Sequence, residues 1–170
     1  MVTQPQLIGG PRLTDVVYTP DWVAKDMVSW FKPAGKVLEP CRGGDAIYRY
    51  LPVNSDWCEI EQGRDFFSWH QKADWIISNP PFSAAMFNSW LEHSYDLAPD
   101  IVYLLPIHFV FRSASKLEIV KRRGWMKQVR FYGTGAQLNF PMGNPIAAIH
   151  FQRGYHGPTE WTWYTHANKS

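Results

Sequence analysis

A short apolar run that ends at two consecutive prolines constrains this chain more than any other stretch. Residues 74–82 read Asp-Trp-Ile-Ile-Ser-Asn-Pro-Pro-Phe. A brief run of this kind is typical of a central strand that is covered on both faces of its sheet. Pro80 and Pro81 fix φ at about −65° and lack an N–H, so the chain must leave the ladder after Asn79. The sequence therefore predicts a buried strand whose carboxyl end carries the Asn79 amide.

The turn after this strand carries groups that suit a planar amine. No local N–H competes for the Pro80 carbonyl, and the side-chain oxygen of Asn79 is a second acceptor. The ring of Phe82 adds a flat face for a planar partner. We take Asn79, Pro80, Pro81 and Phe82 as the candidate catalytic residues, forming a clamp for an aromatic amine. A plain loop is the alternative, because a Pro-Pro pair by itself is common.

Length and composition indicate one domain. The chain has 170 residues without a linker or repeat, so we expect a single domain over residues 1–170, with residues 1–13 as a flexible arm. The two cysteines and six histidines show neither metal-ligand nor disulfide spacing, and no metal is expected. Nothing resembles a signal peptide or a membrane span, so we expect a cytoplasmic protein without a membrane partner.

The order of expected elements indicates an α/β fold. Helices are expected over residues 21–31, 45–51, 84–97 and 116–123. Strands are expected over residues 37–40, 56–60, 75–77, 101–105, 126–131, 147–152 and 161–164. Strands that alternate with helices and then give way to a β-rich end predict a sandwich around a largely parallel sheet.

Two strand ends carry candidate ligand-binding groups. Gly43 and Gly44 follow the strand at 37–40, where a glycine pair lets the backbone approach a ligand closely. Glu59 lies at the end of the next strand, where a carboxylate can accept both hydroxyls of a ribose. Each signal alone also fits an ordinary turn or an exposed acid.

A basic segment follows in the second half of the chain. Residues 112–130 hold seven basic residues and a single glutamate. Arg112, Lys116, Arg122 and Arg123 are therefore candidate phosphate contacts for a nucleic acid. A solvated helix face explains the same composition equally well.

Taken together, these motifs resemble the S-adenosylmethionine-dependent adenine-N6 methyltransferases. The resemblance rests on Tyr18-Thr19-Pro20, Val37-Leu38-Glu39-Pro40-Cys41-Arg42-Gly43-Gly44, Glu59, Asp65-Phe66 and Asn79-Pro80-Pro81-Phe82, in this order. It implies a Rossmann-like class I methyltransferase sandwich, with S-adenosylmethionine as cofactor. The cofactor residues that it implies are Tyr18, Thr19, Pro20, Glu39, Pro40, Cys41, Gly43, Asp45, Glu59, Ile60, Asp65 and Phe66.

The chain departs from the family pattern at three points. Asp45 stands where the family usually has a second glycine, and its side chain could crowd the cofactor or cap the following helix. The segment between Glu59 and Asp65 is short, which implies that one helix and one strand of the usual fold are absent or vestigial. No stretch is long enough for a separate target-recognition domain, so selectivity is weak, comes from loops or comes from a protein partner.

The resemblance implies methyl transfer to the N6 amine of an adenine flipped out of DNA. The clamp alone also fits adenine in RNA or a glutamine in a protein, because each presents a planar NH₂ group. We favour DNA because the basic segment can follow a phosphate backbone. A catalytically silent module that binds nucleic acid on the same fold is the alternative from another class.

Overall fold

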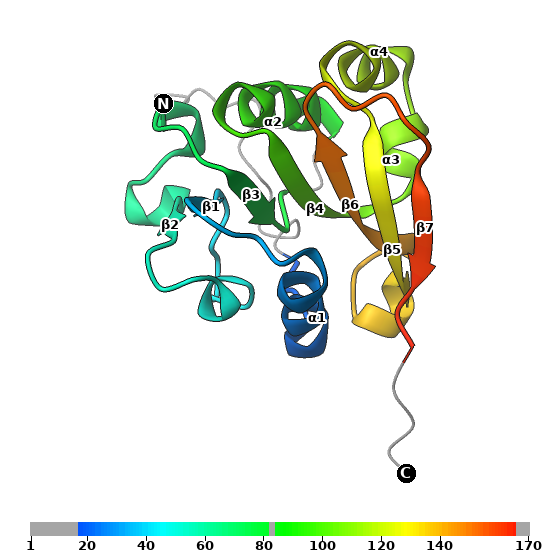
Figure 1. Ribbon diagram of the computed structural model, residues 1–170. Coiled ribbons are helices and arrows are strands. Elements are labelled where there is room, and N and C mark those ends of the chain that lie inside the picture. Colours follow the sequence, from blue (N-terminus) through cyan, green and yellow to red (C-terminus); the bar gives the residue numbers. More distant parts are fainter. Residues whose placement is uncertain (1–16, 82–83, 166–170) are drawn as a thin grey trace, which may run out of the picture.

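The computed structural model describes residues 17–81 and 84–165, which are organised around one seven-stranded sheet (Figure 1). The strand order is β2-β1-β3-β4-β6-β5-β7. The strands are β1 (Val37–Glu39), β2 (Asp56–Trp57), β3 (Trp75–Ser78), β4 (Asp100–Pro106), β5 (Met126–Thr134), β6 (Pro145–Gln152) and β7 (Glu160–Trp163). Only β6 runs antiparallel to its neighbours, β4 and β5. The expected largely parallel sheet with a β-rich carboxyl-terminal end is confirmed.

Helices cover both faces of the sheet. The helix α1 (Asp21–Phe31) lies on one face, and α2 (Ala84–Leu97), α3 (His108–Phe111) and α4 (Ala114–Arg123) belong to the other (Figure 1). Neighbouring residues of the central strands point to opposite layers, since Ile76 packs in the α2 layer and Ile77 in the α1 layer. A strand buried on both faces needs a continuous apolar run, and β3 has one.

The first part of the sheet is much reduced. β2 has two residues, and the connection from β2 to β3 contains only the 3₁₀ turns η3 (Ile60–Gln62) and η4 (Phe66–Ser68). The expected absence of a helix and a strand in this connection is confirmed. The strand predicted over residues 56–60 is too long, because Glu59 already pairs with Arg64 in an isolated bridge.

The helix predicted over residues 45–51 is wrong. Only the 3₁₀ turn η2 (Tyr48–Tyr50) forms there. Asp45 has φ of 65°, in the left-handed region, so a right-handed helix cannot begin at that residue. The helix predicted over residues 116–123 is found, but it begins two residues earlier, at Ala114.

A partly buried ion pair fixes α1 against β5. Arg130 of β5 donates to both carboxylate oxygens of Asp26, at 2.6 and 3.0 Å, and Tyr132 donates to the same carboxylate at 2.8 Å. The ring centroid of Trp30 lies 3.7 Å from the Arg130 guanidinium. This cluster orients α1 and with it residues 17–20, which lead into the helix beside β3.

Candidate active site

The strand order places a crevice between β1 and β3. The chain passes from β1 outward to β2 on one side and from β3 outward to β4 on the other, so the strand order reverses there. In open α/β sheets, ligands bind at the carboxyl ends of the strands at such a point. A cavity of about 450 Å³ lies there. Its lining includes Tyr18, Thr19, Glu39, Cys41, Gly43, Glu59, Ile60, Asn79, Pro80 and Pro81.

A smaller cavity of about 90 Å³ adjoins the larger one. Pro40, Asp65 and Phe66 line it, and the two cavities share Cys41, Glu59, Ile60 and Pro81. Pro20 and Asp45 line neither cavity, and Phe82 lies outside the described residues. Sequence reasoning missed several lining residues, among them Val17, Arg42, Ala46, Ile47 and Trp90. Their residue types carry no signal of their own, since they reach the cavities only through the fold.

The amide of Asn79 is held in one orientation. Its Nδ2 donates to the Val17 carbonyl at 2.8 Å and to the Thr19 hydroxyl at 3.1 Å. A carbonyl oxygen can only accept, so the nitrogen must face Val17 and Oδ1 must face the other way. Oδ1 is buried and has no hydrogen-bond partner in the described part of the chain. Burying an unpaired acceptor costs about 1–3 kcal/mol, which a donating ligand would offset.

A second unpaired acceptor lies at the end of β1. Glu39 is only 1% exposed, and its Oε2 has no partner within residues 17–81 and 84–165. Burial raises the pKa of this carboxyl well above its ordinary value, and the nearby charge of Asp45 adds to the effect. A cationic group placed beside Glu39 would favour the ionised form and lower this pKa.

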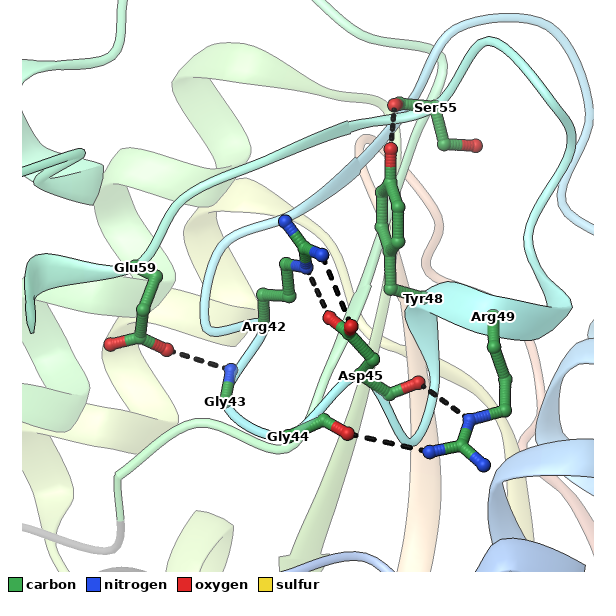
Figure 2. A network of polar contacts seen from close by, with 8 residues as sticks. All are labelled: Arg42, Gly43, Gly44, Asp45, Tyr48, Arg49, Ser55 and Glu59. Carbon is green, nitrogen blue, oxygen red and sulfur yellow. Dashed lines mark hydrogen bonds and ion pairs between the residues drawn. The ribbon is translucent and has the colours of Figure 1, made fainter. Parts of the chain in front are cut away.

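The turn after β1 is tied to the end of β2. The backbone N–H of Gly43 donates to Oε2 of Glu59 at 2.7 Å (Figure 2). Gly43 has φ of 50°, which glycine adopts without steric cost. The ring of Tyr18 would lie 3.5 Å from a Cβ atom placed on Gly44. The glycine pair therefore keeps the turn close to both Glu59 and Tyr18.

Asp45 neither blocks the cavity nor caps an α-helix. Its carboxylate points to Arg42 and accepts two hydrogen bonds from the guanidinium, the one from Nη2 at 3.1 Å (Figure 2). The hydrogen bond from Arg42 lowers the pKa of Asp45. The Arg42 guanidinium also lies 4.4 Å from the ring centroid of Trp57. Aspartate thus adopts the positive φ that a glycine would adopt at this position, and Arg42 holds its side chain aside.

Comparison with known proteins identifies the architecture. No family model matches the chain, and no curated protein matches its sequence. A solved structure described as a class I S-adenosylmethionine-dependent methyltransferase from Listeria monocytogenes aligns with a TM-score of 0.71 at 10% identity. The alignment covers 94% of this chain and 69% of that protein. The chain has the class I methyltransferase fold.

Two further structures with this methyltransferase fold differ in their described roles. The modification subunit of a type I restriction enzyme from Vibrio vulnificus has a TM-score of 0.62 and 15% identity, over 93% of this chain. A protein from Pyrococcus horikoshii described as an RNA methyltransferase has a TM-score of 0.57 and 11% identity, over 85% of this chain and 91% of its own. The chain spans 49% of the restriction modification subunit.

On this methyltransferase fold, most of the basic segment is engaged within the protein. Lys116 is only 3% exposed, and its ammonium lies 5.0 Å from the ring centroid of Phe109. Burial lowers the pKa of Lys116, and the charge of Arg112 adds to the effect. Arg122 forms an ion pair with Glu92 of α2, and Arg123 forms one with Asp96. The acids of α2 are distant in sequence, so the local charge count did not include them.

The basic residues also lie at two different edges of the sheet, one formed by the amino ends and the other by the carboxyl ends of the parallel strands. Arg123 ends α4, and its carbonyl accepts from the N–H of Gly154 beside the start of β4. That edge is opposite the cavities, which lie at the carboxyl ends of the parallel strands. Arg112 is exposed and follows α3, shortly after the carboxyl end of β4. Only Arg112 of the four candidates is both exposed and on the edge of the cavities.

Two kinds of feature are absent from residues 17–81 and 84–165. None of the helices there combines the length and the apolar character needed to cross a bilayer. Within the same ranges, no three His, Cys, Asp or Glu side chains cluster in a way that could hold a metal ion.

Proposed function

We propose that this protein transfers a methyl group from S-adenosylmethionine to the exocyclic N6 amine of an adenine flipped out of DNA. The observation that carries the proposal is the Asn79 amide, whose nitrogen is anchored and whose buried oxygen has no partner among the described residues, at the edge of the larger cavity. Pro80 lines the same cavity, and its carbonyl is a second acceptor. Two acceptors at one strand end suit the two N–H groups of one amine.

The residues around the larger cavity fit the methionine and ribose parts of S-adenosylmethionine. The unpaired Oε2 of Glu39, with its raised pKa, suits the cationic amino group of the cofactor. Glu59 uses one oxygen for Gly43 and has remaining lone pairs for ribose hydroxyls. When bound, S-adenosylmethionine supplies an electrophilic methyl group and leaves as a neutral thioether.

Asn79 and Pro80 would act by positioning the acceptor amine. The lone pair of an adenine amine is delocalised into the ring, which makes the nitrogen a weak nucleophile. Hydrogen bonds from both N–H groups to Asn79 Oδ1 and the Pro80 carbonyl favour a pyramidal nitrogen with its lone pair directed along the line of attack. The surplus proton then leaves to solvent. Phe82, outside the described residues, is proposed to stack on the flipped base.

DNA is the favoured substrate, and RNA is the second candidate. One protein with a similar structure is a restriction modification subunit, and another is described as an RNA methyltransferase. We propose that Arg112 contacts phosphate beside the cavities and that a partner chain adds sequence recognition. The partner proposal rests on the described role of that similar structure as a subunit of a restriction enzyme.

A transfer assay with methyl-labelled cofactor tests the proposal. The protein is incubated with duplex DNA, structured RNA or a protein release factor, and labelled nucleosides are identified after digestion. We expect N6-methyladenine in DNA. Label in RNA alone would select the second candidate, and label in protein alone would contradict a nucleic acid substrate.

The Asn79→Ala variant separates an enzyme from a binding module. We expect the transfer rate to fall by about 10²–10³, as when one positioned polar group is removed from a catalytic site, while DNA binding is retained. Asn88→Ala is the matched control, because Asn88 is also an amide but binds Ser115 between α2 and α4. Wild-type protein that binds DNA but transfers no methyl group to any substrate would support the silent module.

A further inference from the structure

A buried lysine in α4 has no counter-ion in the described part of the chain. Lys116 is only 3% exposed, and its ammonium lies 5.0 Å from the ring centroid of Phe109 and 5.6 Å from that of Phe87. It forms no hydrogen bond or ion pair within residues 17–81 and 84–165. A charge removed from water is unfavourable unless an opposite charge accompanies it. Aromatic rings recover less of this cost than an ion pair would, so an anion beside Lys116 is favoured.

The ammonium of Lys116 is nevertheless open to a ligand. It is not among the polar atoms of the described residues that are both fully buried and unpaired. Since it has no partner among those residues, some of its surface must reach solvent. The small exposed part of this side chain therefore includes its charged end.

Two further basic groups lie near this lysine. Arg112 is exposed and comes four residues before Lys116, and His108 comes four residues before Arg112. Burial lowers the pKa of His108, and the nearby charges of Arg112 and Lys116 lower it further. Nδ1 of His108 is buried and has no partner in the described part of the chain. The three side chains therefore form one cluster of basic groups between α3 and α4.

No acid of the surrounding helices neutralises this cluster. The acids of α2 and α4 pair with other bases, in the pairs Glu92–Arg122, Asp96–Arg123 and Glu118–Lys121. The N-cap of α4 is Ser113, whose side chain makes no capping hydrogen bond. The N–H groups of a first helical turn and the helix dipole favour a negative charge at this end. The start of α4 thus combines unpaired positive charge with a helix end that suits an anion.

We infer that Arg112, Lys116 and the start of α4 form a site for one phosphate group. Phosphate oxygens accept charge-assisted hydrogen bonds from guanidinium and ammonium groups, and a phosphate would supply the counter-ion that Lys116 lacks. The site follows the carboxyl end of β4, on the edge of the sheet that carries the cavities. The inference rests on the proposed function only for the source of the phosphate, which is the backbone of the nucleic acid.

Two variants of α4 that each remove one positive charge test this site. Lys116→Met keeps an unbranched side chain beside the two rings, and Lys121→Met is the matched control, because Lys121 is exposed and pairs with Glu118. Unfolding by urea is measured for both variants and for wild type, in chloride and in phosphate at equal ionic strength. We expect phosphate to raise the midpoints of wild type and Lys121→Met and to leave that of Lys116→Met unchanged.

DNA binding identifies the source of the phosphate. At one low salt concentration, Lys116→Met should bind duplex DNA about ten-fold more weakly than wild type, as for one charge-assisted hydrogen bond. Lys121→Met should bind within about two-fold of wild type. Weaker DNA binding without a response to free phosphate would confine the site to backbone phosphates. A response to free phosphate with unchanged DNA binding would assign the site to free phosphate instead.

The outcomes separate this inference from the proposed function. Equal behaviour of Lys116→Met and Lys121→Met in both measurements would overturn the inference and leave Lys116 as a packing residue. If Lys116→Met does not fold, Arg112→Met takes its place, because Arg112 is exposed, and this variant should lose the response to phosphate. Wild type that binds no DNA would contradict the proposed nucleic acid substrate, whereas the phosphate measurement would still decide whether the site exists.

Discussion

Two acids, the partly buried Asp26 and the buried Glu39, show how differently two regions of this molecule are built. Asp26 of α1 accepts three hydrogen bonds, two from Arg130 and one from Tyr132. Glu39 of β1 is more deeply buried, yet its Oε2 has no partner within the described residues. The hydrogen-bonding capacity of the Asp26 carboxylate is used within the protein, whereas Oε2 of Glu39 is available to a ligand. Glu39, Asn79 and Trp90 each have an unpaired buried polar atom and line one of the two cavities, and we expect ligands rather than the fold to satisfy these atoms.

The largest effect on stability is expected at the satisfied acid. Asp26→Ala leaves the Arg130 guanidinium buried without its counter-ion, which costs about 3–5 kcal/mol of unfolding free energy. Urea denaturation measures this loss. Glu118→Ala is the control, because the Glu118–Lys121 pair is exposed and should change stability by less than about 0.5 kcal/mol. Equal effects at the two positions would contradict the structural role of Asp26.

The next largest effect is expected on kcat, through the orientation of the Asn79 amide. Thr19→Val keeps the shape of the side chain but removes the hydroxyl that accepts from Asn79 Nδ2. We expect kcat to fall about ten-fold, with KM for the cofactor nearly unchanged, because a misoriented amide loses a positioned acceptor. Thr19→Ser restores the hydroxyl and should restore kcat. A change in KM alone would instead place Thr19 among the cofactor contacts.

Glu39 predicts a pH effect on ligand binding. Burial raises the pKa of Glu39 in the free protein, and a cationic amino group beside the carboxyl would favour loss of its proton. Binding of S-adenosylhomocysteine should therefore release protons and strengthen by up to about ten-fold per pH unit as pH rises toward the folded pKa. Calorimetry in buffers of different ionisation enthalpy measures the release. Glu39→Gln should abolish it.

The same carboxyl predicts a stability effect of opposite sign to that of Asp26. The folded pKa of Glu39 lies above the ordinary value of 4.5, so the folded protein binds the proton more tightly than the unfolded chain does. Stability without ligand should therefore fall as pH rises from 4.5 toward the folded pKa. Glu39→Gln should remove this loss and be more stable than wild type at neutral pH. A less stable Glu39→Gln would show that the ionised carboxylate is satisfied within the protein.

The smallest effects are expected in the basic segment. Arg112→Ala should weaken DNA binding for all sequences and reduce the salt slope by about one counterion. Arg122→Ala should leave that slope unchanged, because Arg122 pairs with Glu92 at the edge away from the cavities. The salt slope of each variant is obtained from DNA binding measured across a range of salt concentrations. A reduced slope for Arg122→Ala would show that Arg122 of the basic segment also contacts phosphate.

The sequence by itself determined the elements that depend on local chemistry. The two prolines end β3 after Ser78 and bring Asn79 to a strand end, because proline cannot continue the ladder. Apolar runs predicted the central strands, and their order with the helices predicted the largely parallel sheet. The motif order also predicted most of the residues that line the two cavities. These features follow from neighbouring residues, so they can be read without the fold.

Only the tertiary structure decided which groups have partners. The pairing of Arg122 and Arg123 joins α4 to acids of α2, and the orientation of Asn79 depends on Val17 and Thr19, about 60 residues away in sequence. The positive φ of Asp45 and the unpaired N–H of Trp90 are likewise properties of the folded chain that no local motif predicts. Charge counts and motifs describe which charged and polar groups a single segment contains. Whether a charge or an amide is free depends on contacts between distant segments, because each such contact forms only when the whole sheet and its helices are assembled.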